Sequence, residues 1–277
     1  METLRDAVAV VTGAGSGIGR ALAVALAAEG CALALADIDE RGLTGTSALV
    51  ANVRVTTSRV DVSKIDEMTS FRDEVERDFG RVSLLVNNAG VALYGNVDDV
   101  SIADLEWIVG INFWGAVYGT KLFLPLLRRE PAANVVTISS LFGLIAPPLQ
   151  SGYAASKFAV RGFSEVLRHE LANTNVRVTV VHPGGIKTSI ASSTRRGAHA
   201  DEARYRTDTR AFERALVVSP EVAAARIVAA IRADKPRLLI GRDAYVLDII
   251  QRFFPARYMQ IVAPLIDPKK RKPISNA

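Results

Sequence analysis

The sequence predicts an α/β fold in which a doubly wound parallel sheet carries helices on both faces. Short, nearly continuous apolar runs alternate with longer helical patterns along most of the 277 residues. Strands that are apolar at every position are typical of a parallel sheet buried on both sides. With 49% apolar and 23% charged residues, a chain of this length can bury one large core. Because no internal repeat or low-complexity linker interrupts the pattern, we predict a single domain over residues 1–277.

The predicted elements follow one another in strand–helix order. In the first half we expect strands at 8–11, 32–36, 53–60 and 84–86, and helices at 20–29 and 65–79. Gly30 and Gly80 follow these two helices, as glycine commonly does at a helix end. In the second half we expect a long helix at 102–129 interrupted at Pro125, a strand at 134–138, a helix at 153–173 and a strand at 176–181.

The last third of the chain is less regular. Residues 186–218 hold many arginines and few strong apolar residues, and we expect a mobile lid insertion that binds substrate over the carboxyl end of the sheet. Ser219 and Pro220 then provide an N-cap and a first helical residue for a helix through Ala233, and a strand follows at 237–241. Residues 243–277 form an apolar C-terminal extension with helical stretches at 243–254 and 258–266 and a basic tail. The tail contains Lys269, Lys270, Arg271 and Lys272.

Composition and charge exclude several classes of protein. The chain has 34 Lys+Arg against 29 Asp+Glu, a net charge of +5, and four of its basic residues lie in the tail, so we predict no nucleic-acid partner. One cysteine, Cys31, excludes a disulfide scaffold and fits a reducing compartment. The apolar runs are too short to span a membrane, and the N-terminus does not have the pattern of a signal peptide. We therefore predict a cytoplasmic protein, and the histidine and cysteine spacing predicts no metal site.

A glycine-rich turn follows the first predicted strand. Its glycines Gly13, Gly17 and Gly19 have the spacing G-x-x-x-G-x-G rather than G-x-G-x-x-G. Glycine allows a tight turn here and lets backbone N–H groups at the start of the next helix approach a pyrophosphate. The first strand–helix junction also lies at the edge where such sheets bind ligands. We therefore predict a dinucleotide site that includes Gly13, Gly15, Ser16, Gly17, Ile18 and Gly19.

Asp37 ends the second predicted strand, 18 residues beyond Gly19. A carboxylate there can accept hydrogen bonds from both ribose hydroxyls of NAD and repels a 2′-phosphate. Ile38 and Asp39 come next, so no Arg or Lys directly follows it, and Ser16 within the turn is not basic. We therefore predict NAD as the cofactor and regard NADP as the less favoured alternative.

Three further motifs follow the glycine turn in order: Asn87-Asn88-Ala89-Gly90, Ser140 with Tyr153 and Lys157, and Pro183-Gly184. Over roughly residues 6–190, the chain resembles the short-chain dehydrogenase/reductase family in its compact single-domain branch. The resemblance implies a Rossmann-type sheet and a set of cofactor contacts. These would come from Asp61 and Val62 at the adenine, from Asn88, Ala89 and Gly90 along the cofactor, and from Pro183, Gly184, Ile186 and Thr188 at the nicotinamide end.

Tyr153 and Lys157 are one helical turn apart, so both side chains would lie on one face of their helix. A free tyrosine has a pKa of about 10, too high for a base at neutral pH, but a nearby ammonium and a cationic nicotinamide ring favour the phenolate. We predict Tyr153 as general acid/base, Lys157 as its partner that also reaches the nicotinamide ribose, and Ser140 as the residue that polarises the substrate oxygen. The resemblance also implies that Asn112 bends its helix and links Lys157 to solvent through water.

These residues predict an oxidoreductase that transfers a hydride between NAD and the carbonyl or secondary alcohol of a largely apolar substrate. The candidate pocket walls are apolar: Val91, Leu93, Leu141, Phe142, Leu149 and Ile190. The arginines of residues 186–218 offer a different interpretation, recognition of an acidic group. Two alternatives to the main prediction are an NADP-dependent ketone reductase and a catalytically silent NAD-binding regulatory protein.

The sequence also makes predictions about partners. The resemblance implies that the long helices around Asn112 and Lys157 pair across subunits, so we expect a homodimer or homotetramer. The apolar C-terminal segments together with the basic cluster have two interpretations. They form either a lid over the substrate or a weak peripheral contact with a membrane.

Overall fold

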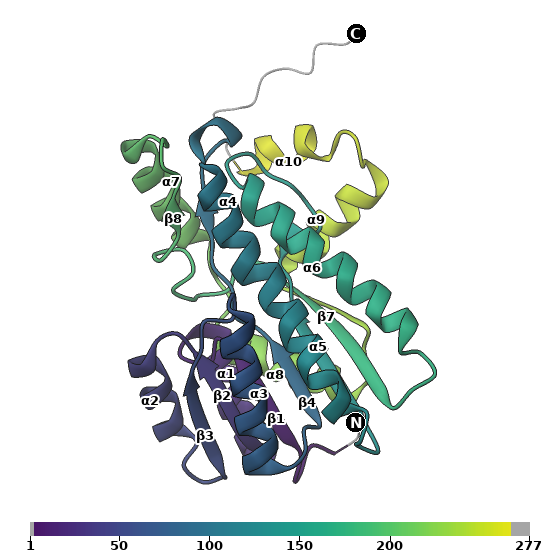
Figure 1. Ribbon diagram of the computed structural model, residues 1–277. Helices are drawn as coiled ribbons and strands as arrows, with labels where there is room; N and C mark the ends of the chain where they lie inside the picture. The colour runs from purple at the N-terminus through teal and green to yellow at the C-terminus, as the bar shows by residue number, and fades with distance from the viewer. Residues whose placement is uncertain (1–2, 267–277) are drawn as a thin grey trace.

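The computed structural model describes residues 3–266, and its centre is a seven-stranded parallel sheet (Figure 1). The spatial order of the strands is β3-β2-β1-β4-β6-β7-β9. They are β1 (Val8–Thr12), β2 (Ala32–Asp37), β3 (Val55–Arg59), β4 (Leu84–Asn87), β6 (Ala133–Ile138), β7 (Val176–Pro183) and β9 (Arg237–Ile240). Because the order runs outward from β1 and β4 in both directions, the predicted doubly wound sheet is confirmed, with its ligand-binding crevice expected at the carboxyl ends of these two strands.

Helices cover both faces of the sheet (Figure 1). One face carries α1 (Gly17–Ala28), α2 (Glu40–Leu49) and α8 (Pro220–Arg232), and the other carries α3 (Ile65–Phe79), α5 (Gly115–Leu127) and α6 (Ser151–Glu170). Strand β2 shows how its residues are shared: Leu33 and Leu35 belong to the first hydrophobic cluster, Ala34 and Ala36 to the second. Successive side chains point to opposite faces, and both faces are buried at the inner strands, so these are largely apolar, whereas the edge strand β3 is polar and partly exposed.

Two helical regions differ from the sequence prediction. Helix α2 was not predicted, because two glycines and few apolar residues weaken its pattern; Asp39 caps it by accepting the Arg41 N–H at 3.1 Å. The predicted helix at 102–129 is three segments: α4 (Ile102–Val109), a π-helical segment η2 (Gly110–Trp114), and α5. Pro125 lies inside α5 and does not interrupt it, so the predicted position of the break was wrong.

The last third contains more regular structure than the sequence indicated. The segment 186–218 forms β8 (Arg195–Arg196), which pairs with β5 (Leu93–Tyr94), and α7 (Glu202–Ala215). The predicted C-terminal helical stretches are α9 (Arg242–Phe253) and α10 (Tyr258–Ile266). Within residues 3–266, none of the helices is long and apolar enough to cross a membrane. The basic tail at 269–272 lies outside the described residues.

Candidate active site

Tyr153 and Lys157 lie one turn apart in α6 and are both buried. The Lys157 Nζ lies 5.8 Å from the centroid of the Tyr153 ring. The same Nζ donates a hydrogen bond of 3.0 Å to the carbonyl oxygen of Ile138, the last residue of β6. The ammonium is therefore anchored at the carboxyl end of the sheet, beside the phenol, as the helical spacing predicts.

Burial shifts the pKa values of Tyr153 and Lys157 in opposite directions. Loss of solvation lowers the pKa of Lys157 to about 8. Burial raises the pKa of Tyr153, and a hydrogen bond with Ser140 acts against that rise. The sequence argument expected a lowered phenol pKa, but the chain by itself keeps the phenol protonated. Lys157 alone therefore does not lower the pKa of the phenol, and the protonated Tyr153 side chain is a proton donor.

Ser139 and Ser140 follow β6 and point in different directions. The Ser139 hydroxyl donates to the carbonyl oxygen of Lys157 at 2.9 Å and is buried behind α6. The Ser140 hydroxyl accepts the Phe142 N–H at 3.1 Å, capping the short helix η3 (Leu141–Gly143), and bonds with the Tyr153 phenol. Ser140 is therefore the member of the pair that faces Tyr153, as the alternation along a strand predicts.

Asn112 lies in the π-helical segment between α4 and α5. Its Oδ1 accepts the Val91 N–H at 2.8 Å, and its Nδ2 donates to the Val91 carbonyl at 3.0 Å and to the Ser156 hydroxyl at 2.9 Å. The Ser156 hydroxyl in turn donates to the carbonyl of Tyr153 at 2.8 Å. The amide therefore joins the segment after β4 to the catalytic turn of α6, and the helix is irregular at the residue where the family resemblance places a bend.

The glycine turn between β1 and α1 has the backbone that its composition predicts. Gly13 and Gly17 have φ of +65° and +52°, a region that favours glycine. A Cβ on Gly13 would lie 2.7 Å from the Ala89 Cα, and one on Gly19 would lie 2.0 Å from the Gly13 oxygen. Ser16, the N-cap of α1, makes no side-chain cap hydrogen bond, so the first-turn N–H groups are left for another acceptor.

Asp37 lies at the opening of this turn. Its Oδ2 accepts the Gly15 N–H at 2.8 Å and its Oδ1 accepts the Asp39 N–H at 3.0 Å. Sequence analysis missed Arg20, whose guanidinium donates to the carbonyl oxygens of Gly15 and Gly42. No local signal marks Arg20, because α2, the element it holds against the turn, was itself not predicted.

Two more predicted segments meet the glycine turn. The Asn88 Nδ2 donates to the carbonyl oxygens of Thr12 at 2.9 Å and Gly13 at 3.0 Å, so the motif after β4 braces the turn. Gly90 leaves room for the catalytic groups, since a Cβ there would lie 3.1 Å from the Lys157 Nζ and 3.2 Å from the Asn112 Oδ1. The structure therefore brings together residues 13–19, residues 88–90 and the turn of α6 that carries Tyr153 and Lys157.

The segment after β7 also reaches the turn. A Cβ on Gly17 would lie 3.1 Å from the Thr188 Cγ2, so Thr188 is beside the start of α1. Pro183 ends β7, and Ile186 is buried. Sequence analysis missed what holds this segment: Asp243 in the first turn of α9 accepts the Gly185 N–H at 2.8 Å.

Gly184 lets the Asp243 carboxylate approach this segment closely, because it has no side chain. A Cβ at position 184 would lie 2.3 Å from both carboxylate oxygens of Asp243. Gly185 and Asp243 are 58 residues apart, and no local pattern connects them. The loop at the predicted nicotinamide end is therefore positioned by the C-terminal extension, which the sequence did not indicate.

The predicted adenine contacts, Asp61 and Val62, follow β3. The Asp61 N–H donates to the Glu67 Oε2 at 2.7 Å, and the Asp61 Oδ1 accepts the Ser63 N–H at 3.0 Å. Val62 is buried against Gly115, where a Cβ would lie 2.8 Å from the Val62 Cγ2. The Val62 side chain is thus a core residue, and any contact it makes with a ligand is limited by that burial.

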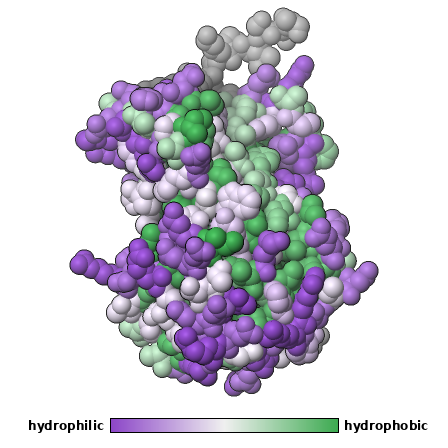
Figure 2. Space-filling model, viewed as in Figure 1, coloured by the Kyte–Doolittle hydropathy of each residue, from purple (hydrophilic) through white to green (hydrophobic). Residues whose placement is uncertain are grey.

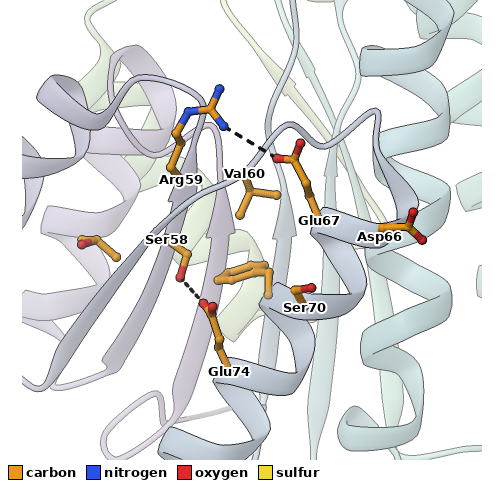
Figure 3. Close-up of a pocket in the computed structure, with 9 residues that line it drawn as sticks. Ser58, Arg59, Val60, Asp66, Glu67, Ser70 and Glu74 are labelled. Carbon is orange, nitrogen blue, oxygen red and sulfur yellow. Dashed lines mark hydrogen bonds and ion pairs between the residues drawn. The ribbon is translucent and has the colours of Figure 1, made fainter.

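A hollow of about 380 Å³ lies between β3 and α3 (Figure 3). A hydrogen bond joins Ser58 to Glu74 across it, and an ion pair of 4.0 Å joins Arg59 to Glu67. Its lining includes none of the glycine-turn residues, and it contains the carboxylates of Asp66, Glu67 and Glu74. Clustered negative charge repels phosphate groups, so this hollow does not fit the predicted dinucleotide.

Comparison with known proteins agrees with this arrangement. The sequence profile described as "short chain dehydrogenase" matches residues 7–199. The chain belongs to the short-chain dehydrogenase/reductase family. This is a family of oxidoreductases, and the fold predicted from the sequence is that of its members.

Individual relatives cover almost the whole chain. SadH of Mycobacterium tuberculosis, whose name calls it an oxidoreductase, is 44% identical over 268 residues, which are 95% of this chain and 96% of SadH. A short-chain dehydrogenase/reductase of Burkholderia phymatum, solved in complex with NAD, is 32% identical with a TM-score of 0.85, covering 92% of this chain and 96% of that one. A short-chain dehydrogenase of Streptomyces avermitilis is 28% identical with a TM-score of 0.81, covering 94% and 97%.

Apolar side chains surround Tyr153 in this family member. Its hydrophobic cluster contains four of the predicted pocket walls: Val91, Leu93, Phe142 and Ile190. Leu141 belongs to a neighbouring cluster with α9, and Leu149 lines a different hollow. Sequence analysis missed Phe212 of α7, whose ring centroid lies 6.5 Å from that of Phe142, itself 6.0 Å from Tyr153. Phe212 is a single large apolar residue in a polar helix, a signal that was present in the sequence.

The arginines of residues 186–218 are mostly engaged. Arg195 forms an ion pair of 3.1 Å with Asp104 and lies over the Trp107 ring at 4.7 Å. On α7, Arg204 pairs with Asp208 at 3.6 Å, and Arg206 pairs with Glu202. The helix is held against β5 by the Tyr94 hydroxyl, which donates to Asp208 at 2.7 Å, and by contact between the rings of Tyr94 and Tyr205. These contacts bind the segment to the body of the protein.

Proposed function

We propose that this protein transfers a hydride between NAD and the carbonyl or secondary alcohol carbon of a largely apolar substrate, with Tyr153 as general acid/base. The observation that carries the proposal is the Tyr153–Lys157–Ser140 arrangement beside the glycine turn. One buried phenol has an ammonium 5.8 Å from its ring centroid and a hydroxyl bonded to its oxygen. The segment 88–90 joins this arrangement to the glycine turn, since Asn88 bonds the Gly13 carbonyl and Gly90 lies against the Lys157 Nζ.

The residues of the turn fit a nicotinamide dinucleotide. The uncapped first turn of α1 presents N–H groups for a pyrophosphate, and Asp37 presents a carboxylate for ribose hydroxyls. The B. phymatum relative, solved with NAD, supports the same cofactor class. The bound nicotinamide would accept or donate the hydride.

The chain's own residues would manage the proton. In the reducing direction the Tyr153 hydroxyl donates its proton to the substrate oxygen, and the Ser140 hydroxyl donates a hydrogen bond to the same oxygen. The Lys157 pKa of about 8 keeps the amine mostly protonated at neutral pH, so its charge favours the phenolate that remains. In the oxidising direction the phenolate takes the alcohol proton back.

Asp37 supports NAD over NADP. Its carboxylate, which already accepts the Gly15 N–H, would repel a 2′-phosphate. Arg20, the cation found beside the turn, donates to backbone carbonyls and to the Thr46 hydroxyl instead of facing outward. An NADP-dependent ketone reductase is the second candidate, and the choice is a direct outcome of the assay below.

The surroundings of Tyr153 support an apolar substrate. Val91, Leu93, Phe142 and Ile190 pack in its cluster, and α7 adds Phe212. Three of the six arginines that offered an acidic substrate as the other interpretation, Arg195, Arg204 and Arg206, are paired with Asp104, Asp208 and Glu202. We place α7 as part of a lid over the substrate, since its Phe212 is the residue that approaches the cluster from the insertion.

We also propose a homodimer or homotetramer built through α5 and α6. Exposed Phe158 and Val166 lie on α6, and exposed Trp114 directly precedes α5; Figure 2 shows hydrophobic surface where Figure 1 places these two helices. Burial of such a patch stabilises an interface. Sedimentation velocity of Val166→Asp should show a smaller species than the parent chain. A cytoplasmic location is supported by the single cysteine, Cys31, which is free and buried.

Turnover assays test the function. We expect oxidation of NADH with members of a panel of hydrophobic ketones, and a lower KM for NADH than for NADPH. Tyr153→Phe should keep its affinity for NADH, measured by fluorescence titration, and lose at least about a thousandfold in kcat. The matched control is Tyr245→Phe, an exposed tyrosine of α9, which should keep full activity.

The outcomes separate the alternatives. Retained turnover in Tyr153→Phe would remove the proposed acid/base. A lower KM for NADPH would select the reductase alternative. Tight NAD binding by the parent chain without turnover of any panel member would select the catalytically silent regulatory protein.

A further inference from the structure

Helix α9 places its apolar side chains outward. Its buried positions are Ala244 and Asp248, and the carboxylate of Asp248 is satisfied by Arg237 at 2.6 and 3.0 Å. Four of its exposed positions are large and apolar and follow one helical stripe, Tyr245, Val246, Ile249 and Phe253, while Arg242 and Arg252 are exposed as well. A surface helix of a globular protein has the opposite arrangement, with its charges facing solvent.

The apolar surface continues beyond α9. Phe253 is 76% exposed and Phe254 is 52% exposed, and Ile261 of α10 is 38% exposed. Contiguous exposed apolar side chains on a folded protein mark a contact surface. We name the exposed Val246, Ile249, Phe253, Phe254 and Ile261 the C-terminal face.

The charge of this part of the chain is positive. Residues 249–277 contain six Lys and Arg residues and a single acidic residue, Asp267, so the net charge of +5 is the charge of this segment. Arg252 and Arg257 lie among the apolar residues of the face, and Arg252 is already paired with the buried Asp248 at 3.1 Å. Arg257 is therefore the cation of the described residues 249–266 that the face itself contributes. The remaining four basic residues follow at 269–272 in the sequence. Apolar side chains with flanking cations are the composition that binds an anionic lipid surface.

The C-terminal face is anchored to the body of the protein. Asp243 holds the first turn of α9 against Gly185, and the Tyr258 hydroxyl of α10 accepts the Ala146 N–H at 2.9 Å. Tyr258 also packs with Leu141 and Leu144, which follow Ser140 in the chain. The helices are therefore held from behind, and their outward stripe is not needed to keep them folded.

We propose that the C-terminal face docks this protein on the surface of an anionic lipid membrane. A second copy of the chain fits less well, because a twofold contact through this face would bring two segments of charge +5 together. An anionic surface attracts the cations and receives the apolar side chains at the headgroup boundary. The contact is peripheral; within residues 3–266, none of the helices is long and apolar enough to cross a membrane.

Vesicle co-sedimentation of the full chain tests the proposal without any use of enzymatic activity. The probes are vesicles of phosphatidylcholine alone and of phosphatidylcholine mixed with phosphatidylglycerol. We expect binding to the mixed vesicles, none to the neutral ones, and release in high salt. Phe253→Ser should lower the partition coefficient about tenfold. The combined variant K269Q/K270Q/R271Q/K272Q should lower it about fivefold per charge removed.

Leu49→Ser is the matched control, because Leu49 is an exposed apolar residue at the end of α2, distant from α9 and α10 in Figure 1. It should bind as the parent chain does. The proposal is overturned if the parent chain stays in solution with mixed vesicles at low salt, or if Phe253→Ser binds as well as the parent. It is also overturned if Phe253→Ser reduces the oligomeric state in sedimentation velocity, since the face would then be a subunit contact.

Discussion

Polar groups are arranged differently around Tyr153 and in the outer helices α7, α9 and α10. Around Tyr153 they are buried and paired: Asn112 makes three hydrogen bonds, and Ser139, Ser156 and Lys157 each donate to a backbone carbonyl. In α7 the ion pairs are exposed, and in α9 apolar side chains face solvent. An unpaired buried polar atom costs far more free energy than a broken exposed pair, so single polar substitutions should cost more around Tyr153 than among the exposed pairs of α7.

Lys157→Met should lower activity and yet raise stability, because it removes a charged group that is costly to bury. We expect a loss of at least about a hundredfold in kcat and a gain of about 2 kcal/mol in the free energy of unfolding at pH 7. The Lys157 pKa is lowered from 10.5 to about 8, so the unfolded chain binds more protons between these values. The penalty is full below pH 8 and disappears as the pH rises towards 10.5.

Urea unfolding at pH 7 and pH 10 measures this effect. The stability advantage of Lys157→Met over the parent chain should shrink at the higher pH. The control is Lys121→Met, an exposed lysine of α5, whose difference from the parent should be small at both pH values. A Lys157→Met variant less stable than the parent at pH 7 would contradict the burial cost.

Asn112→Ala tests the buried network itself. The change leaves the N–H and carbonyl of Val91 and the hydroxyl of Ser156 without their partner. We expect a loss of about 3 kcal/mol in the free energy of unfolding, measured by urea titration. Asn96→Ala, at an exposed asparagine that bonds Asp99, should cost less than about 1 kcal/mol. Equal losses of unfolding free energy at the two positions would contradict the higher cost of leaving buried polar groups unpaired.

His182→Gln tests a buried group directly behind Ser140. Burial lowers the pKa of His182 to about 4, and its Nδ1 donates to the Ser140 carbonyl at 3.2 Å. Between pH 6.5 and pH 4 the unfolded chain therefore binds more protons than the folded one. Stability should fall as the pH drops through this window, by up to about 3 kcal/mol.

In His182→Gln the fall over this window should be clearly flatter, as measured by thermal or urea unfolding at several pH values. The control is His169→Gln, an exposed histidine near the end of α6, which should keep the slope of the parent chain. If His182→Gln kept that slope as well, the acid sensitivity would come from other groups.

Tyr94→Phe has the smallest expected effect and tests how the outer helix α7 is held. It removes the hydrogen bond to Asp208 that holds α7, but leaves the contact of the ring with Tyr205. We expect a change in unfolding free energy below about 1 kcal/mol. Trypsin should cut at the arginines of α7 several-fold faster, because the helix opens locally more often. Tyr118→Phe is the control, and a cutting rate equal to the parent's would show that this bond does not hold α7.

Local patterns allowed much of the fold to be predicted. The inner strands of the central sheet were found because burial on both faces makes them largely apolar, and α3 was found with its observed bounds because its apolar positions repeat with the helical period. Helix α2 was missed because Gly42 and Gly45 weaken that pattern. The local pattern placed a break in this helix at Pro125, whereas the family resemblance placed a bend at Asn112, and the irregular segment is Gly110–Trp114. The local pattern missed it because the partner that holds Asn112 there is Val91, which is distant in sequence.

The sequence by itself determined which residues form the candidate site: a glycine turn after the first strand, Asp37 after the second, and Tyr153 and Lys157 one turn apart, since all of these depend on spacing along a single element. Tertiary structure decided how those pieces are held. Asp243 on Gly185, Arg20 on Gly15, and Phe212 beside Phe142 join segments whose distance along the chain carries no periodicity. It also decided that the apolar stripe of α9 faces outward, because which face of a helix is buried depends on the elements that pack against it.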